Sequence, residues 1–173
     1  MLSHTEIMKW LLSNTEGYSL GGERVDVSKS YVINKDGEVD CFCSIQLTLM
    51  KSVSVPFNFG TIQGSMRCGS TSLKNLSWLP SHVGGTLDVS ATGIRSFAGI
   101  STRVKYVGNS IALPSTPIPS HCLGLLLIGG APGFTCSSDE NVAGILNKHR
   151  GTGDIIAAQD ELIDAGYIDQ ARM

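Results

Sequence analysis

Two neighbouring segments of the chain repeat one pattern of apolar residues at an offset of 21 positions. The first segment runs from Gly64 to Val83, and the second from Gly85 to Val104. A unit this short cannot bury its apolar face alone, so each copy must pack against a neighbour. The aligned apolar pairs are Met66 with Leu87, Cys68 with Val89, Leu73 with Ile94, Leu76 with Phe97, Leu79 with Ile100, and Val83 with Val104.

Each copy opens with alternating apolar and polar residues, Gly-x-Met-x-Cys in the first and Gly-x-Leu-x-Val in the second. Such alternation is typical of a half-buried strand. We therefore expect Met66 and Cys68 to point inward, and Ser65 and Arg67 to point outward. A tight return to the next strand is indicated by leucines at every third position: Leu73, Leu76 and Leu79.

Less regular versions of the unit flank the two clear copies. Residues 105–124 keep apolar positions at altered spacing, and Leu125 and Leu127 offer a further Leu-x-Leu strand. Upstream, an alternating stretch begins at Val39. Repeats of about 20–29 residues with Leu-x-x-Leu-x-Leu spacing are typical of leucine-rich repeats. The sequence thus predicts an α+β fold: a short leucine-rich-repeat-like β-solenoid of about four coils, capped by an N-terminal helix and a C-terminal helical segment.

The expected caps carry their own signals. Ser3 and Glu6 form a capping-box pattern, which predicts a helix over residues 3–14. Ser137 and Glu140 repeat that pattern before a second helix, and a third is expected between Gly153 and Gly166. We divide the chain into an N-terminal helical cap with a connecting loop (1–30), the solenoid (31–136) and a C-terminal helical cap (137–173). Within the solenoid, Asp36-Gly37 is expected to turn a hairpin.

Composition limits the environment of the protein. The five cysteines are an odd number and favour a reduced, cytoplasmic setting. The N-terminal residues are interrupted by His4, Glu6 and Lys9, which argues against a signal peptide. The most hydrophobic window, residues 123–130, is far shorter than the roughly 20 residues that a membrane span needs. We expect a soluble protein without a membrane partner.

Four stretches resemble a family of short leucine-rich-repeat-like proteins encoded by tailed bacteriophages. They are YVINKDGEVD, LTLMKSVSVPFNFGTIQGSMRC, LSWLPSHVGGTLDVSATGIRSF and DIIAAQDELIDAGYIDQARM, within residues 31–173. The most specific pieces are the DG-x-VD segment and ELIDAG at 161–166. The resemblance implies a phage source, a repeat fold with helical ends, and no catalytic motif. It places the protein in the cytoplasm of a host cell.

Residues that could carry chemistry have simpler structural explanations. Cys41 and Cys43 have a metal-like spacing, but alternate residues of one strand also share a buried face. A zinc site would need His121 and Cys122 to join them through a long-range contact. A nucleophile would need a positioned base and an oxyanion hole, and the four histidines lie in different segments. We therefore expect neither an enzyme, nor a cofactor, nor a metal.

Charge is unevenly distributed along the chain. Residues 1–40 carry a net charge of −3, residues 41–138 +5 and residues 139–173 −4. Lys74 and Arg95 occupy equivalent positions of the two copies and would stack about 4.8 Å apart if the copies are in register. They would meet an anionic partner, or simply extend into solvent. The candidate binding residues are Arg67, Asp88, Thr86 and Ser65 on the outward strand face, where Arg67 and Asp88 would pair, together with Lys74, Arg95, Arg103 and Lys105.

Three functions are compatible with these features. The first is a non-enzymatic protein-binding module, a phage accessory protein that binds a host or phage protein and modulates it sterically, as an inhibitor would in host takeover. The second is nucleic-acid binding through the basic middle, which the acidic ends, the pI near 6.0 and the few aromatic residues disfavour. The third is self-association as a virion or assembly component, through exposed apolar residues such as Trp78 or those at 125–128.

Overall fold

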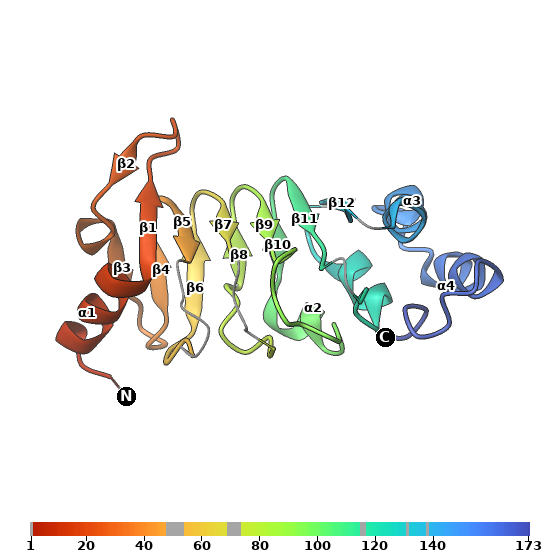
Figure 1. The fold of residues 1–173 in the computed structure, drawn as a ribbon, viewed down its shortest axis with the longest axis horizontal. Coiled ribbons are helices and arrows are strands. Elements are labelled where there is room, and N and C mark those ends of the chain that lie inside the picture. Colours follow the sequence, from red (N-terminus) through yellow and green to blue (C-terminus); the bar gives the residue numbers. More distant parts are fainter. Residues whose placement is uncertain (1, 48–53, 69–73, 115–116, 131, 138) are drawn as a thin grey trace.

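The computed structural model describes residues 2–47, 54–68, 74–114, 117–130, 132–137 and 139–173. The protein is elongated, with α1 (His4–Asn14) at one end and α3 (Glu140–His149) and α4 (Ile155–Asp164) at the other (Figure 1). Between them, two sheets enclose one hydrophobic core. Over the described ranges, no helix has the length and apolar character that a membrane span requires.

The strands divide between a seven-stranded and a five-stranded sheet. The first has the order β12 (Gly133–Thr135), β11 (Ser110–Ala112), β9 (Leu87–Asp88), β7 (Met66–Arg67), β5 (Ser44–Leu47), β1 (Thr15–Tyr18), β2 (Arg24–Val25). The second has the order β10 (Tyr106–Val107), β8 (His82–Val83), β6 (Phe59–Ile62), β4 (Val39–Cys41), β3 (Tyr31–Ile33). Short helices lie in the connections: η1 (Val27–Lys29), α2 (Ile100–Arg103) and η2 (Cys122–Leu127).

The expected leucine-rich-repeat-like β-solenoid of about four coils is wrong. The chain is an α+β protein with two mixed, mostly parallel sheets; β1 pairs antiparallel with β2 and β5, and β3 pairs antiparallel with β4. The segments expected to form tight returns between strands of one sheet contain strands of a second sheet, such as β8. Strand β8 has two residues, of which only Val83 points into the core. A strand this short gives no recognisable alternation of apolar and polar residues. Leu73 lies outside the described residues.

The repeat of the sequence places equivalent apolar residues side by side in the core. In the seven-stranded sheet the register aligns Ile45, Met66, Leu87, Ile111 and Phe134 on successive strands. All five side chains are buried, as are Cys68 and its aligned residue Val89. Arg67 between them is exposed and Ser65 half-buried. The predicted inward and outward orientations are confirmed at these positions.

The N-terminal predictions of local structure are confirmed. Ser3 caps α1, and a complete capping box joins it to Glu6. Strands β3 and β4 form the hairpin, in which Gly37 has a φ of 78° and donates its amide to Asn34. Residues 15–18 and 24–25, inside the segment assigned to a cap and loop, form β1 and β2. Their hairpin projects from the body of the protein (Figure 1).

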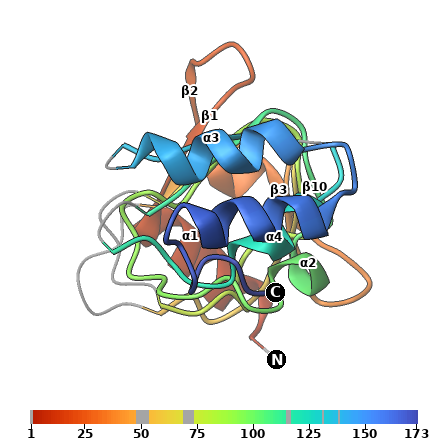
Figure 2. The same ribbon diagram turned by 90° about the vertical axis from the view of Figure 1, so that its right-hand side faces the viewer.

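Helices α3 and α4 lie side by side across the C-terminal end (Figure 2). Asn147 of α3 closes the edge strand β12, because its side-chain amide both accepts from the Phe134 N–H and donates to the Phe134 carbonyl, each at 2.8 Å. The cap of α3 is Asp139 rather than the predicted Ser137. The strand expected at Leu125 and Leu127 is wrong, since these residues belong to η2.

Glu161 connects these two helices and should make stability depend on pH. Its carboxylate lies 2.7 Å from Lys148 Nζ and 2.8 Å from His149 Nε2, and these hydrogen bonds lower the pKa of Glu161 below its ordinary value of 4.5. The stabilisation is present above that value and is lost as the pH falls through the lowered pKa. In Glu161→Gln, we expect the thermal unfolding midpoint to fall less as the pH is lowered from 7 to 3 than it does in the wild-type protein. Circular dichroism would measure this midpoint. An unchanged profile would contradict the role of this carboxylate.

Candidate functional site

The outward face of the seven-stranded sheet is polar. One row of residues on successive strands consists of Glu16, Gln46, Arg67, Asp88, Ala112 and Thr135. A parallel row consists of Tyr18, Ser44, Ser65, Thr86 and Ser110. In this second row hydroxyl groups link the strands: Ser44 Oγ accepts from the Ser65 N–H, and Ser65 Oγ accepts from the Thr86 N–H, both at 3.0 Å. Thr86 Oγ1 and Ser110 Oγ are also 3.0 Å apart.

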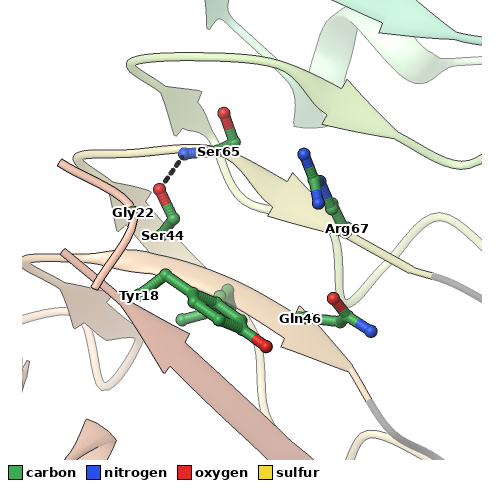
Figure 3. Close-up of a pocket in the computed structure, with 7 residues that line it drawn as sticks. Tyr18, Gly22, Ser44, Gln46, Ser65 and Arg67 are labelled. Carbon is green, nitrogen blue, oxygen red and sulfur yellow. Dashed lines mark hydrogen bonds between the residues drawn. The ribbon is translucent and has the colours of Figure 1, made fainter. Parts of the chain in front are cut away.

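A groove of about 310 Å³ lies on this face where β1, β5 and β7 meet. Figure 3 shows Tyr18, Gln46 and Arg67 on these three neighbouring strands, and Gly22 from the β1–β2 connection beside them. Ser44, Ile45 and Ser65 complete the lining. The groove is thus formed by two sheet strands and a projecting hairpin, which brings together residues from three separate parts of the sequence.

Arg67 is the cation of the groove. Its side chain is exposed and forms no ion pair or hydrogen bond with any residue that the structure describes. The pairing with Asp88 that the sequence suggested is wrong: the two residues are Cα partners, but the Asp88 carboxylate accepts from the Ser90 N–H at 3.0 Å and from the Ser90 hydroxyl at 2.6 Å.

The other nearby carboxylate is also engaged. Glu16 lies 3.2 Å from Arg24 and accepts a hydrogen bond of 2.8 Å from the Tyr18 hydroxyl. This hydrogen bond raises the pKa of Tyr18, while the charges of Arg24 and Arg67 act in the opposite direction. Among the described residues, no carboxylate pairs with the Arg67 guanidinium, although Glu16 and Asp88 lie on strands to either side of it.

The remaining predicted binding residues do not join this site. Lys74 and Arg95 are both exposed, and their expected stacking stays a prediction. Arg103 lies near the second sheet, where its guanidinium pairs with Glu38 at 2.6 Å. Lys105 directly precedes β10 and donates to the Ser101 carbonyl at 2.8 Å. The basic residues of the middle segment are thus distributed over different parts of the surface.

Tyr18, Ser44 and Gln46 line the groove but were not identified from the sequence. The alternation Ser44-Ile45-Gln46-Leu47 was a usable signal, because its polar residues face outward as Ser65 and Arg67 do. Tyr18 had no such signal. It reaches the groove through the antiparallel pairing of β1 with β5, which no local pattern encodes.

The cysteines are placed for packing rather than for reaction. All five are buried, as expected for structural cysteines. Burial raises the pKa of the Cys41, Cys43 and Cys68 thiols, and raises that of Cys122 to about 12. Thiols with raised pKa values are poor nucleophiles and poor metal ligands. Within the described ranges, no group of three or more His, Cys, Asp or Glu side chains is arranged to hold a metal ion.

The histidines lie in separate surroundings. His4 stacks on Tyr31, His82 stacks on Tyr106, and His149 contacts Glu161 between α3 and α4. His121 has a φ of 61°, and its Nδ1 lies within 3.1 Å of two serine hydroxyls, those of Ser96 and Ser120. Each imidazole thus has a local structural role, and none lines the groove beside Arg67.

The apolar residues suggested for self-association are mostly inaccessible. Trp78 is 2% exposed, and Leu125 and Ile128 are buried as well, so a surface built on them is wrong. Leu127 of this run is exposed.

Comparisons of the chain with protein-family models, with curated proteins and with solved structures gave no match. The resemblance to phage proteins therefore stays an expectation from the sequence.

Proposed function

We propose that this protein is a non-enzymatic protein-binding module whose contact surface is the outward face of the seven-stranded sheet. The observation that carries the proposal is the exposed guanidinium of Arg67, which pairs with none of the described residues and lies beside a polar groove. Arginine is enriched where protein interfaces have their strongest contacts. On the resemblance in the sequence, the partner would be a host or phage protein that binding modulates sterically.

The charge pattern of the sheet face favours a protein partner over a nucleic acid. Along one row, Glu16, Gln46, Arg67 and Asp88 present negative, neutral, positive and negative groups on successive strands. A nucleic acid presents regularly spaced phosphates and is bound by neutralising several of them. Here its neighbouring phosphates would meet carboxylates, whereas a protein can place a single anion opposite Arg67 and neutral or basic groups opposite Asp88.

The test is affinity capture from a lysate of phage-infected bacteria, with and without nuclease. We expect the wild-type protein to retain one protein in stoichiometric amount, independently of nuclease. Arg67→Glu should abolish capture, because it adds a third carboxylate to the row, beside Glu16 and Asp88, and removes the cation. Arg95→Glu makes the same charge change at an exposed position outside the groove and should leave capture intact.

Two results would contradict the proposal. Capture of nucleic acid that disappears with nuclease would favour the alternative function. Equal retention of the partner by the Arg67→Glu and wild-type proteins would place the contact surface elsewhere.

A further inference from the structure

The groove beside Arg67 offers mainly hydrogen-bond donors. Ser44 Oγ and Ser65 Oγ each accept a backbone N–H, so the proton of each hydroxyl is available to another group. The Gln46 amide and the Arg67 guanidinium have no hydrogen-bond partner among the residues that the structure describes, and between them they supply further N–H donors. A ligand that satisfies this lining must therefore be rich in acceptors.

The lining also limits the charge of the ligand. Arg67 is the one cation among the seven described residues that line the groove, and the neighbouring positions of its row hold Gln46 and Asp88. One guanidinium balances one negative charge, and its planar fork matches the two oxygens of a carboxylate. Phosphate groups on protein segments are usually recognised by clusters of arginines, which this groove does not have.

We propose that the groove binds the carboxylate of a single aspartate or glutamate in an extended segment of the partner protein. This inference rests on the proposed function and names the group that the partner presents. The carboxylate forms a bidentate pair with Arg67 and accepts from the Gln46 amide. The Ser44 and Ser65 hydroxyls donate to backbone carbonyls of the same segment.

The spacing of the donors fits an extended peptide. Ser65 precedes Arg67 by two residues on one outward face, which separates them by about 6.6 Å at about 3.3 Å per strand residue. Ser44 precedes Gln46 by the same interval on the adjacent strand. Two pairs of donors thus lie one strand apart, so an acidic side chain over Arg67 and Gln46 brings its own main chain over the serines.

The experiment is a titration of the full-length protein, followed through the backbone amide resonances of Ser44, Gln46, Ser65 and Arg67 by NMR. The probes are N-acetylglutamate methylamide, N-acetylglutamine methylamide and inorganic phosphate, at constant ionic strength. We expect saturable shifts of these four amides with the glutamate probe, and affinity about tenfold weaker for the glutamine probe, because the charge-assisted pair is lost. Phosphate should bind more weakly than the glutamate probe.

Variants separate groove binding from general charge attraction. Arg67→Gln, which retains a donor amide, should weaken binding of the glutamate probe about tenfold. Arg95→Gln removes another exposed cation, outside the groove, and should leave binding unchanged. Persistence of the shifts in Arg67→Gln, or tighter binding of phosphate than of the glutamate probe, would overturn the inference.

The outcome can be distinguished from failure of the proposed function. If Arg67→Glu loses the captured partner but the glutamate probe produces no shifts, the inference is overturned and the protein-binding function stands. If capture does not depend on Arg67, the proposed function fails, and the assignment of the groove to a partner's side chain fails with it.

Discussion

Replacing Gly84 by alanine should lower the free energy of unfolding by about 3 kcal/mol, because the new methyl group would collide with the backbone. A Cβ at this position would lie 2.0 Å from the Gln63 carbonyl oxygen. Gly84 follows β8 and donates its amide to Ile62 of the adjacent strand at 2.9 Å, so the close approach belongs to the sheet pairing itself. The same approach recurs one strand along, where a Cβ on Gly108 would lie 2.1 Å from the Gly84 oxygen.

Urea denaturation would measure this loss as a shift in midpoint at unchanged slope. The matched control is Gly144→Ala in α3, where a Cβ meets nothing within 4 Å. That substitution should stabilise the protein by about 0.5–1 kcal/mol, because alanine loses less conformational freedom in a helix than glycine. If Gly84→Ala alone folds poorly, the loss can be measured by comparing the Gly84→Ala/Gly144→Ala double variant with Gly144→Ala. A Gly84→Ala protein as stable as wild type would contradict the close approach.

Arg103→Ala should destabilise the protein by about 2–3 kcal/mol, because it removes three hydrogen bonds and leaves the partly buried Glu38 carboxylate without its partner. The guanidinium pairs with Glu38 at 2.6 Å, donates through Nε to the Leu79 carbonyl at 2.5 Å, and donates to the Phe59 carbonyl as well. The side chains of the pair retain only 20% and 21% exposure, respectively, so water replaces these contacts poorly.

Lysine should not rescue this position, because a single ammonium group cannot reproduce the fork that reaches all three acceptors. We expect Arg103→Lys to lower the free energy of unfolding by more than half as much as Arg103→Ala does. Urea denaturation of both variants would measure this. The control Arg95→Ala removes an exposed arginine and should change stability by less than about 0.5 kcal/mol. If Arg103→Ala left stability unchanged but abolished partner capture, Arg103 would belong to the binding surface, as its place in the basic middle segment suggests.

The two arginines illustrate how position decides the role of one residue type. Arg67 and Arg103 both lie in the basic middle segment, and both were candidates for binding. The Arg103 guanidinium donates hydrogen bonds to three acceptors of its own chain, including Glu38, which lies 65 residues away in the sequence. Arg67 faces outward from a strand whose neighbouring carboxylates are already satisfied. Their different surroundings follow from contacts that composition and charge counts do not contain.

The sequence by itself determined the features that depend on neighbouring residues. Alternation predicted the orientations of Met66 and Arg67, the capping box predicted α1, and the hairpin at Gly37 was confirmed. These succeed because backbone conformation and the facing of side chains are set over a few residues. The offset of 21 between the two copies also predicted which residues become neighbours, as the pairing of Met66 with Leu87 confirms.

Only the tertiary structure decided the two-sheet architecture and the composition of the groove. Strands β8 and β10 of the second sheet have two residues each, too few to produce a periodic signal. Strand β1 joins the first sheet by pairing with residues about 30 positions away. Tyr18, Gln46 and Arg67 converge because of that pairing. Such contacts are selected by the packing of the whole core, so a local pattern could place Arg67 on the surface but could not supply the residues that surround it.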